Sequence, residues 1–362
     1  MTAENQNRPW KTGFEIELMA PPGRSRRDLA DRIAARIGGT VRTVFYPQSE
    51  PSLVPNLPVF ENLVLGFDVL DPDGRRAALL VDDLTLRADL DRNTPALPGW
   101  LRVLSDDARL LDLVQRHCDP TTPRETVLAP VAALYGTELV HAEGDITKAV
   151  DGAERPVAMA APLPGERERP CEIITPPYKT DPAPALTALL ADAAELGFTV
   201  PVEAAVHIHF DAGRLTPART LSRLILVLHR HGDFLRRLVG TNPNCVRLGS
   251  IADNLVELAK SDAFQAANPD DARAMLVTCK PTKYADFNFR NLAHLLPGKT
   301  TFEARIFPGS MDAGVIVGHA QLMESILVWA EHADAVELPE TGDDLLRAIE
   351  LASHAAARRP DV

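Results

Sequence analysis

Acidic, basic and imidazole side chains occupy every second position in three short segments that are otherwise largely apolar. The segments are GFEIEL (residues 13–18), VHIHF (206–210) and TFEARIF (301–307). Successive side chains of a β-strand point to opposite faces, so residues i and i+2 share a face about 6.5 Å apart. If these segments are strands, each presents one polar pair on one face. The pairs are Glu15 with Glu17, His207 with His209, and Glu303 with Arg305.

A fourth segment, CEIITPP (171–177), adds Glu172, with Ile174 sharing its face. Any one of these patterns is typical of a half-exposed strand, and a Glu-x-Arg pair is usually a surface ion pair worth little energy. Four such segments in one chain favour polar faces that converge. Crowded carboxylates repel one another and raise one another's pKa, and a divalent cation relieves that repulsion.

A cluster rich in carboxylates with one or two imidazoles suits Mg²⁺ or Mn²⁺ better than zinc, which prefers fewer ligands and more sulfur and nitrogen. Such sites commonly hold the phosphates of a nucleotide. Two basic residues, Arg305 and Lys283, are placed in the sequence to meet a γ-phosphate, where charge spreads over the oxygens during transfer. The residues therefore predict a metal site that handles phosphate.

The first elements that would position these groups follow from local signals. A strand is predicted at 13–19 and a helix at 25–37, capped by Ser25 and ended by Gly38. The stretch 46–60 carries four prolines and predicts a loop. Strands follow near 62–70 and 77–87, and the DPDG sequence between them predicts a hairpin turn.

Most of the remaining elements are helices. A later strand is predicted at VHIHFD (206–211), and KYADFNFRNL (283–292) and TFEARIFPG (301–309) are predicted to be two paired strands. Helices are predicted at 105–117, 183–196, from Pro217 toward Gly240, at about 250–278, at 313–333 and at 342–358. Short strands scattered among helices indicate an α+β fold, with an antiparallel or mixed sheet and helices on one face.

Composition limits the partners and the compartment. The chain has 362 residues, 45% of them hydrophobic, and a formal net charge of −12, so a broad nucleic-acid or anionic membrane surface is not expected. The four cysteines form no C-x-x-C pair, which favours reduced thiols in the cytoplasm. The N-terminus lacks a signal-peptide core, and we expect no uncharged apolar run near the roughly 20 residues that span a bilayer.

The ordered set GFEIEL, CEIITPP, HIHFD, KYADFN and TFEARIFPGSMD resembles the putative amidoligase family. That family belongs to the glutamine synthetase and glutamate–cysteine ligase superfamily of carboxylate–amine ligases. The resemblance runs from about residue 12 to about residue 335, and it lies in the order and spacing of motifs that are individually short.

The resemblance implies a role for each matching residue. Arg305 would stabilise the transferred phosphoryl group, and Glu303 would act beside it as a catalytic metal ligand. Lys283, His209 and Asn288 would lie near the nucleotide or substrate. The implied magnesium ligands are Glu15, Glu17, Glu172, His207 and Glu303.

Two positions depart from the family pattern. Ala205 and Val206 stand where the family usually has glycine just before its histidine pair, which leaves open whether His207 or His209 binds the metal. Ala304 stands where the family often has phenylalanine. Neither change removes a ligand.

The implied fold is that of the glutamine synthetase catalytic domain, a curved, mainly antiparallel sheet forming a half-barrel or funnel with helices on its outer face. The whole chain, 1–362, would be one catalytic domain with its core at about 12–335, and 336–362 would be a C-terminal helical extension. The stretch 151–170 is expected to be a surface loop, or a flap whose arginines face ATP or substrate.

The implied activity is an ATP-dependent ligation of a small-molecule or peptide carboxylate to an amine or ammonia, through an acyl phosphate. A metal-dependent hydrolase that uses the same Glu/His cluster to activate water is the alternative enzyme class. A non-catalytic relative that keeps the fold as a binding module is a third reading. Nucleotide dependence separates the ligase from the hydrolase, because a hydrolase works with metal alone.

Overall fold

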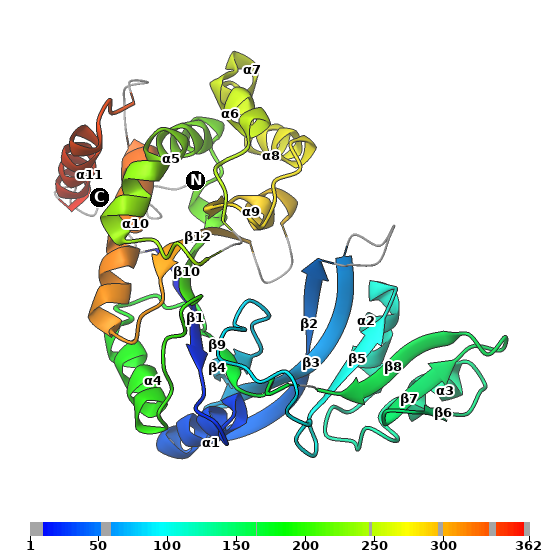
Figure 1. Cartoon of the computed structure of the whole chain (residues 1–362). Helices are drawn as coiled ribbons and strands as arrows, with labels where there is room; N and C mark the ends of the chain where they lie inside the picture. Colours follow the sequence, from blue (N-terminus) through cyan, green and yellow to red (C-terminus); the bar gives the residue numbers. More distant parts are fainter. Residues whose placement is uncertain are drawn as a thin grey trace. The chain divides into compact units, whose positions relative to one another are not determined.

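The computed structural model, shown in Figure 1, describes residues 10–51, 59–163, 165–245, 248–295, 300–332 and 338–357. The chain divides into two compact units. The first unit comprises 1–16, 176–190 and 203–362, and the second comprises 17–175 and 191–202. The chain passes from the first unit to the second within strand β1 (Thr12–Met19). That residues 1–362 act as one catalytic domain stays a prediction.

The sheet of the first unit has the strand order β11-β12-β10-β1, with antiparallel pairing throughout. Its strands are β1, β10 (Ala205–Asp211), β11 (Phe287–Asn288) and β12 (Thr301–Pro308). The predicted alternation is confirmed, because Phe14, Ile208 and Phe302 between the polar positions are at most 1% exposed. One face of these strands is therefore core, and the other carries the polar pairs.

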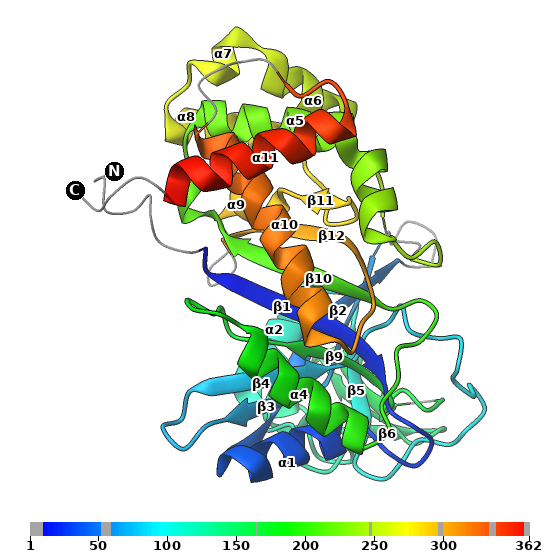
Figure 2. The ribbon, with the colours of Figure 1, turned by 90° about the vertical axis from the view of Figure 1, so that its left-hand side faces the viewer.

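Helices make up the rest of the first unit. They are η2 (Ala212–Arg214), α5 (Ala218–Val239), α6 (Asp253–Lys260), α7 (Asp262–Gln265), α8 (Pro269–Thr278), α9 (Arg290–His294), α10 (Ala313–His332) and α11 (Gly342–Ala357). Figure 2 shows α10 lying across the strands of this unit, and the ring of His319 stacks on Phe307 of β12 at 4.8 Å between centroids. Helix α5 is continuous and ends at Gly240, whose φ of 69° is left-handed.

Helix α10 is long and apolar enough to cross a membrane when judged by length and composition alone. It is not an uncharged run of that length, because Glu324 lies within it, so the sequence-based expectation is not contradicted. Half of the most apolar 18-residue stretch of α10 is buried inside the protein, where α10 packs against α5 and α11. Core helices of soluble proteins share this length and composition.

The sheet of the second unit has the order β9-β4-β3-β5-β8-β7-β6, with β2 pairing only with β3. Its strands are β2 (Thr40–Pro51), β3 (Val59–Leu70), β4 (Arg76–Val81), β5 (Leu101–Ser105), β6 (Val140–Ala142), β7 (Ile146–Val150), β8 (Pro156–Pro162) and β9 (Pro170–Ile174). All of these pairs are antiparallel. Among the described residues neither unit's strands close into a barrel, which agrees with an open antiparallel sheet; funnel-like curvature stays a prediction.

Helices α1 (Arg26–Ile37), α2 (Ala108–His117) and α3 (Ala129–Leu134) pack on this sheet, and α4 (Ala183–Glu195) runs from one unit into the other. Helix α1 confirms its predicted bounds. Ser25 and Asp28 form a capping box at its start, and Gly38, with φ of 67°, accepts the left-handed conformation that ends it.

The loop predicted at 46–60 is wrong at both of its ends, since β2 extends to Pro51 and β3 begins at Val59; residues 52–58 lie outside the described part of the chain. Proline breaks a central strand because it cannot donate to the ladder, but an edge strand tolerates it. Strand β2 is such an edge, because β3 is its only partner among the described strands. Pro47 and Pro51 therefore lie in an edge strand, which the sequence alone does not distinguish from a loop.

Two other segments also differ from expectation. Within 151–170, residues Pro156–Pro162 form β8, paired with β5 on one side and β7 on the other. Within 283–292, only Phe287 and Asn288 form a strand. The strand stops there because the Asn288 side-chain carbonyl accepts a hydrogen bond from the Arg290 backbone at 2.8 Å, a side chain-to-backbone contact that turns the chain into α9.

Candidate functional site: a Glu/His cluster in the first unit

Strand pairing brings the segments with alternating polar residues side by side. In the register of β1 with β10, Glu15 lies opposite His207. In the register of β10 with β12, His209 lies opposite Glu303. These four residues are called the Glu/His cluster below. Gly13 lies opposite His209, so β1 places no side chain directly across from this imidazole.

The two imidazoles contact opposite oxygens of Glu15. His207 Nδ1 lies 3.2 Å from Glu15 Oε2, within hydrogen-bond geometry. His209 Nε2 lies 3.2 Å from Glu15 Oε1. The same two nitrogens lie 3.8 Å and 3.9 Å from Glu303 Oε1. The Glu15 carboxylate thus lies between the two imidazoles, and the Glu303 carboxylate lies within 4 Å of both of them.

Glu303 is held by two further side chains. The Asn288 amide donates to Glu303 Oε2 at 2.6 Å across the β11–β12 pair. Arg305, two residues along the same strand face, donates from Nη1 to Glu303 Oε1 at 2.6 Å. Glu303 is only 4% exposed, so these contacts orient a buried carboxylate. The Glu-x-Arg pattern is therefore part of the cluster and not a surface ion pair.

The charges in the cluster shift one another's protonation. Burial alone would raise the pKa of Glu15, but the charge on His209 and the hydrogen bond from His207 hold it well below 4.5. The pKa of Glu303 is also lowered, since His209 and Arg305 outweigh its burial. Burial lowers the pKa of His209, yet Glu15 and Glu303 reverse that effect and raise it above 6.5. Two ionised carboxylates beside an imidazole are a set that attracts cations.

Three of these side chains are arranged to bind a metal ion. One ligand atom each of Glu15, His209 and Glu303 lie within 4.8 Å of one another. His209 Nε2 is buried and has no hydrogen-bond partner, because its approach to Glu15 is not that of a hydrogen bond. A buried nitrogen that faces two carboxylates without a hydrogen bond fits a divalent cation.

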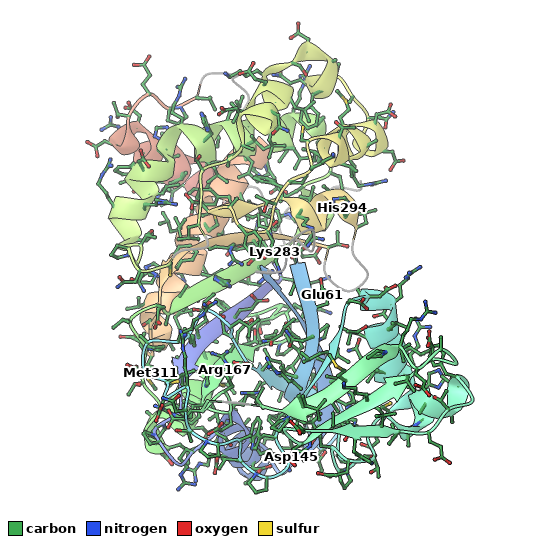
Figure 3. The ribbon with its side chains drawn as sticks, turned by 45° about the vertical axis from the view of Figure 1, so that its right-hand side comes forward. Glu61, Asp145, Arg167, Lys283, His294 and Met311 are labelled. Carbon is green, nitrogen blue, oxygen red and sulfur yellow. The ribbon has the colours of Figure 1, made fainter. Side chains whose placement is uncertain are left out.

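Other predicted residues lie outside this cluster. Glu17, 3% exposed on β1, and Glu172, half-buried on β9 opposite Val81, belong to the second unit. Lys283, labelled in Figure 3, is in the first unit and is half-buried; its ammonium lies 5.3 Å from the centroid of the Tyr284 ring. The metal roles of Glu17 and Glu172 and the nucleotide role of Lys283 stay predictions.

The arginines expected in a flap have other partners. Arg167 donates to the carboxylate of Asp82 and to the backbone carbonyls of Asp83 and Leu86. Arg169 donates to the carbonyls of Ala20 and Asp89 at 2.9 Å and pairs with Glu166. Arg155 pairs with Asp151 on the surface. Arg167 and Arg169 therefore anchor the turn before β9 to the loop after β4.

One residue that the sequence analysis did not select contacts the cluster. The hydroxyl of Thr301 lies 3.2 Å from His209 Nδ1. Thr301, Glu303 and Arg305 share one face of β12 by the same two-residue period that marked the acidic pairs. Extending that period by one step toward the N-terminus would have found it.

Comparison with known proteins agrees with this geometry. A family model described as putative amidoligase enzyme matches residues 8–327. The chain belongs to this family. The match includes each segment that contributes to the Glu/His cluster, and it supports an enzyme of the ligase class. No curated protein and no solved structure matches the chain significantly, so the glutamine synthetase-like architecture stays a prediction.

Proposed function

We propose that the protein is an ATP- and Mg²⁺-dependent ligase that joins a carboxylate to an amine. The observation that carries the proposal is the grouping of Glu15, His209 and Glu303 within 4.8 Å, with Arg305 bonded to Glu303, in a member of an amidoligase family. A member that had become a binding module would have no reason to keep the half-buried Glu15 and the buried Glu303 charged beside each other.

The donor set favours Mg²⁺ or Mn²⁺. Glu15 and Glu303 offer carboxylate oxygens and His209 one imidazole nitrogen, and hard oxygen-rich sets suit these ions. When bound, the ion would neutralise charge on phosphate oxygens. Glu17 and Glu172 belong to the second unit, so their metal roles stay predictions, and we propose that His207 holds Glu15 in place through its 3.2 Å hydrogen bond.

Amide formation from a free carboxylate and an amine is uphill in water, so the acid must be activated. In the proposed reaction, an oxygen of the acid attacks the γ-phosphorus of ATP, ADP leaves, and an acyl phosphate forms. The amine nitrogen then attacks the carbonyl carbon, loses a proton, and inorganic phosphate leaves. We propose that Arg305 stabilises the transferred phosphoryl group, and that Lys283 and Asn288 contact the nucleotide.

The substrate classes are a small-molecule or peptide carboxylate and an amine or ammonia. We propose testing them by phosphate release with ATP and Mg²⁺, using a panel of acids crossed with amines. The expected result is phosphate release that requires both an acid and an amine. Hydrolysis of an amide that proceeds with the metal ion but without ATP would instead indicate that the protein is a hydrolase.

Two variants sharpen the assay. Glu303→Gln removes a cluster carboxylate and should abolish turnover. Glu257→Gln is the matched control, because Glu257 is a carboxylate of the same unit whose side chain is 70% exposed and forms a surface ion pair with Lys260. Equal turnover in the two variants would overturn the proposal.

A further inference from the structure

The two nitrogens of His209 have different surroundings. Nδ1 lies 3.2 Å from the hydroxyl oxygen of Thr301. Nε2 is buried, has no hydrogen bond, and lies 3.2 Å from Glu15 Oε1 and 3.9 Å from Glu303 Oε1. One side of the ring is therefore bonded to the protein, and the other side faces two carboxylates.

Strand register fixes this arrangement. On the β10–β12 pair, His209 lies opposite Glu303 and Asp211 lies opposite Thr301. Thr301 is thus the diagonal neighbour of His209 on the polar face, within reach of a ring that leans along the strand. Glu303 occupies the direct position, so β12 supplies one group to each side of the imidazole.

The Thr301 hydroxyl can donate or accept a hydrogen bond, so its contact with Nδ1 is compatible with the tautomer that a metal at Nε2 requires. A neutral imidazole carries one N–H and one lone pair, and the hydrogen bond made by one nitrogen decides which nitrogen can bind a metal. When the Thr301 oxygen accepts the hydrogen of Nδ1, the lone pair is on Nε2, the nitrogen that faces Glu15 and Glu303. His207 differs, because its Nδ1 bonds directly to Glu15 Oε2.

We infer that Thr301 is a positioning residue that holds His209 with Nε2 as the metal donor, and that His209 is the imidazole ligand of the pair. The inference rests on the metal site of the proposed function but not on the ligase reaction. Thr301 acts through His209 and is not itself a ligand.

The test measures Mn²⁺ binding to the full chain by isothermal titration calorimetry and by electron spin echo envelope modulation, which detects a coordinated imidazole nitrogen. Thr301→Val removes the hydroxyl at nearly constant volume and should weaken Mn²⁺ binding about 10- to 100-fold, as loss of a group behind a ligand does. Thr301→Ser restores a hydroxyl and should bind within a few-fold of the wild type. The nitrogen signal should disappear in His209→Gln and persist in His207→Gln.

Thr300→Val is the matched control. Thr300 precedes Thr301, and among the hydrogen bonds of the described residues none joins its hydroxyl to an imidazole. Thermal unfolding without metal identifies variants that fail to fold, and Thr301→Ala is a second removal variant for that case. Wild-type Mn²⁺ affinity in a folded Thr301→Val or Thr301→Ala protein would overturn the inference, as would loss of the nitrogen signal in His207→Gln alone.

The outcomes separate this inference from the proposed function. Mn²⁺ binding that depends on Thr301, in a protein without ATP-dependent phosphate release, would refute the ligase and retain the positioning role. Ligase activity with a Thr301→Val affinity equal to that of the wild type would do the reverse.

Discussion

The two units each bury a group of charged side chains, and the groups differ in how their charges are satisfied. In the second unit, Arg26 is fully buried and donates to the backbone carbonyls of Leu65, Arg167 and Pro170 at 2.6–3.3 Å. Arg167 and Arg169 similarly combine carbonyls with one carboxylate each. Together these form an arginine network made of Arg26, Arg167, Arg169, Asp82 and Glu166.

The Glu/His cluster of the first unit is organised in the opposite way. Two carboxylates approach the same pair of imidazoles, and His209 Nε2 has no hydrogen bond. In the arginine network, guanidinium N–H groups donate to backbone carbonyls and carboxylates, and the Leu65 carbonyl accepts from two nitrogens of Arg26. A buried charged group that completes its own hydrogen bonds stabilises the fold. A cluster in which like charges crowd around a nitrogen without a hydrogen bond is instead suited to bind an added cation.

The sharpest test of this difference is removal of a carboxylate from the Glu/His cluster. Glu303→Gln should reduce ATP-dependent turnover by about 10³-fold or more, because a catalytic metal supplies several kcal/mol of transition-state stabilisation. The melting temperature should change by only a few degrees. Steady-state kinetics measures the turnover, and calorimetry measures the melting temperature. A Glu303→Gln variant that loses stability but keeps its turnover would show that the cluster stabilises the fold and does not act in the reaction.

The corresponding change in the arginine network should affect stability instead. Arg26→Met leaves three buried carbonyls without their donor and should cost about 3–5 kcal/mol of unfolding free energy. The melting temperature should fall by about 10 °C, with turnover per folded molecule retained.

Arg27→Met is its matched control. Arg27 is the next residue on α1, its side chain is 44% exposed, and its ion pair with Asp31 is on the surface. That substitution should cost less than about 1 kcal/mol. Equal destabilisation by the two changes would mean that the buried carbonyl contacts of Arg26 do not stabilise the unit.

Arg305 tests whether geometry or charge alone matters in the Glu/His cluster. Arg305→Lys keeps the charge but loses the planar fork, and it should lower kcat about 10- to 100-fold. Mn²⁺ affinity should stay near that of the wild type, because Arg305 contacts a ligand without being one. A loss of metal affinity as large as the loss in kcat would place Arg305 in metal binding instead.

The smallest expected effect is the pH dependence of the metal-free protein. The pKa of His209 is raised above 6.5, so its contribution to stability is present below that pH and is lost as pH rises through the folded pKa. The pKa values of Glu15 and Glu303 are lowered below 4.5, so their contributions are present above pH 4.5 and lost at lower pH. Chemical denaturation of the wild type and His209→Gln from about pH 6 upward should show their stabilities drawing together. A constant difference would contradict the raised pKa of His209.

Much of the site could be predicted because its signal is local. The two-residue period of a strand requires only neighbouring residues, and it placed Glu15, His207 and Glu303 on polar faces before any pairing was known. Helix ends were equally local, as the capping residue Ser25 and the left-handed Gly38 show. The assignment of 46–60 to a loop was wrong at its ends, because proline is tolerated both in loops and in edge strands and so does not distinguish them.

By itself the sequence determined which residue types alternate, and therefore which strands carry the candidate ligands and which family the chain resembles. Only the tertiary structure decided which groups meet. Glu15 and His207 are 192 residues apart, and their contact depends on the register of β1 with β10. The pairing of β10 with β12 gave His209 its neighbour Thr301, while backbone carbonyls accept hydrogen bonds from Arg167 and Arg169. Side-chain periodicity follows from the backbone of one strand, but register and buried hydrogen-bond partners follow from segments that are far apart in the chain.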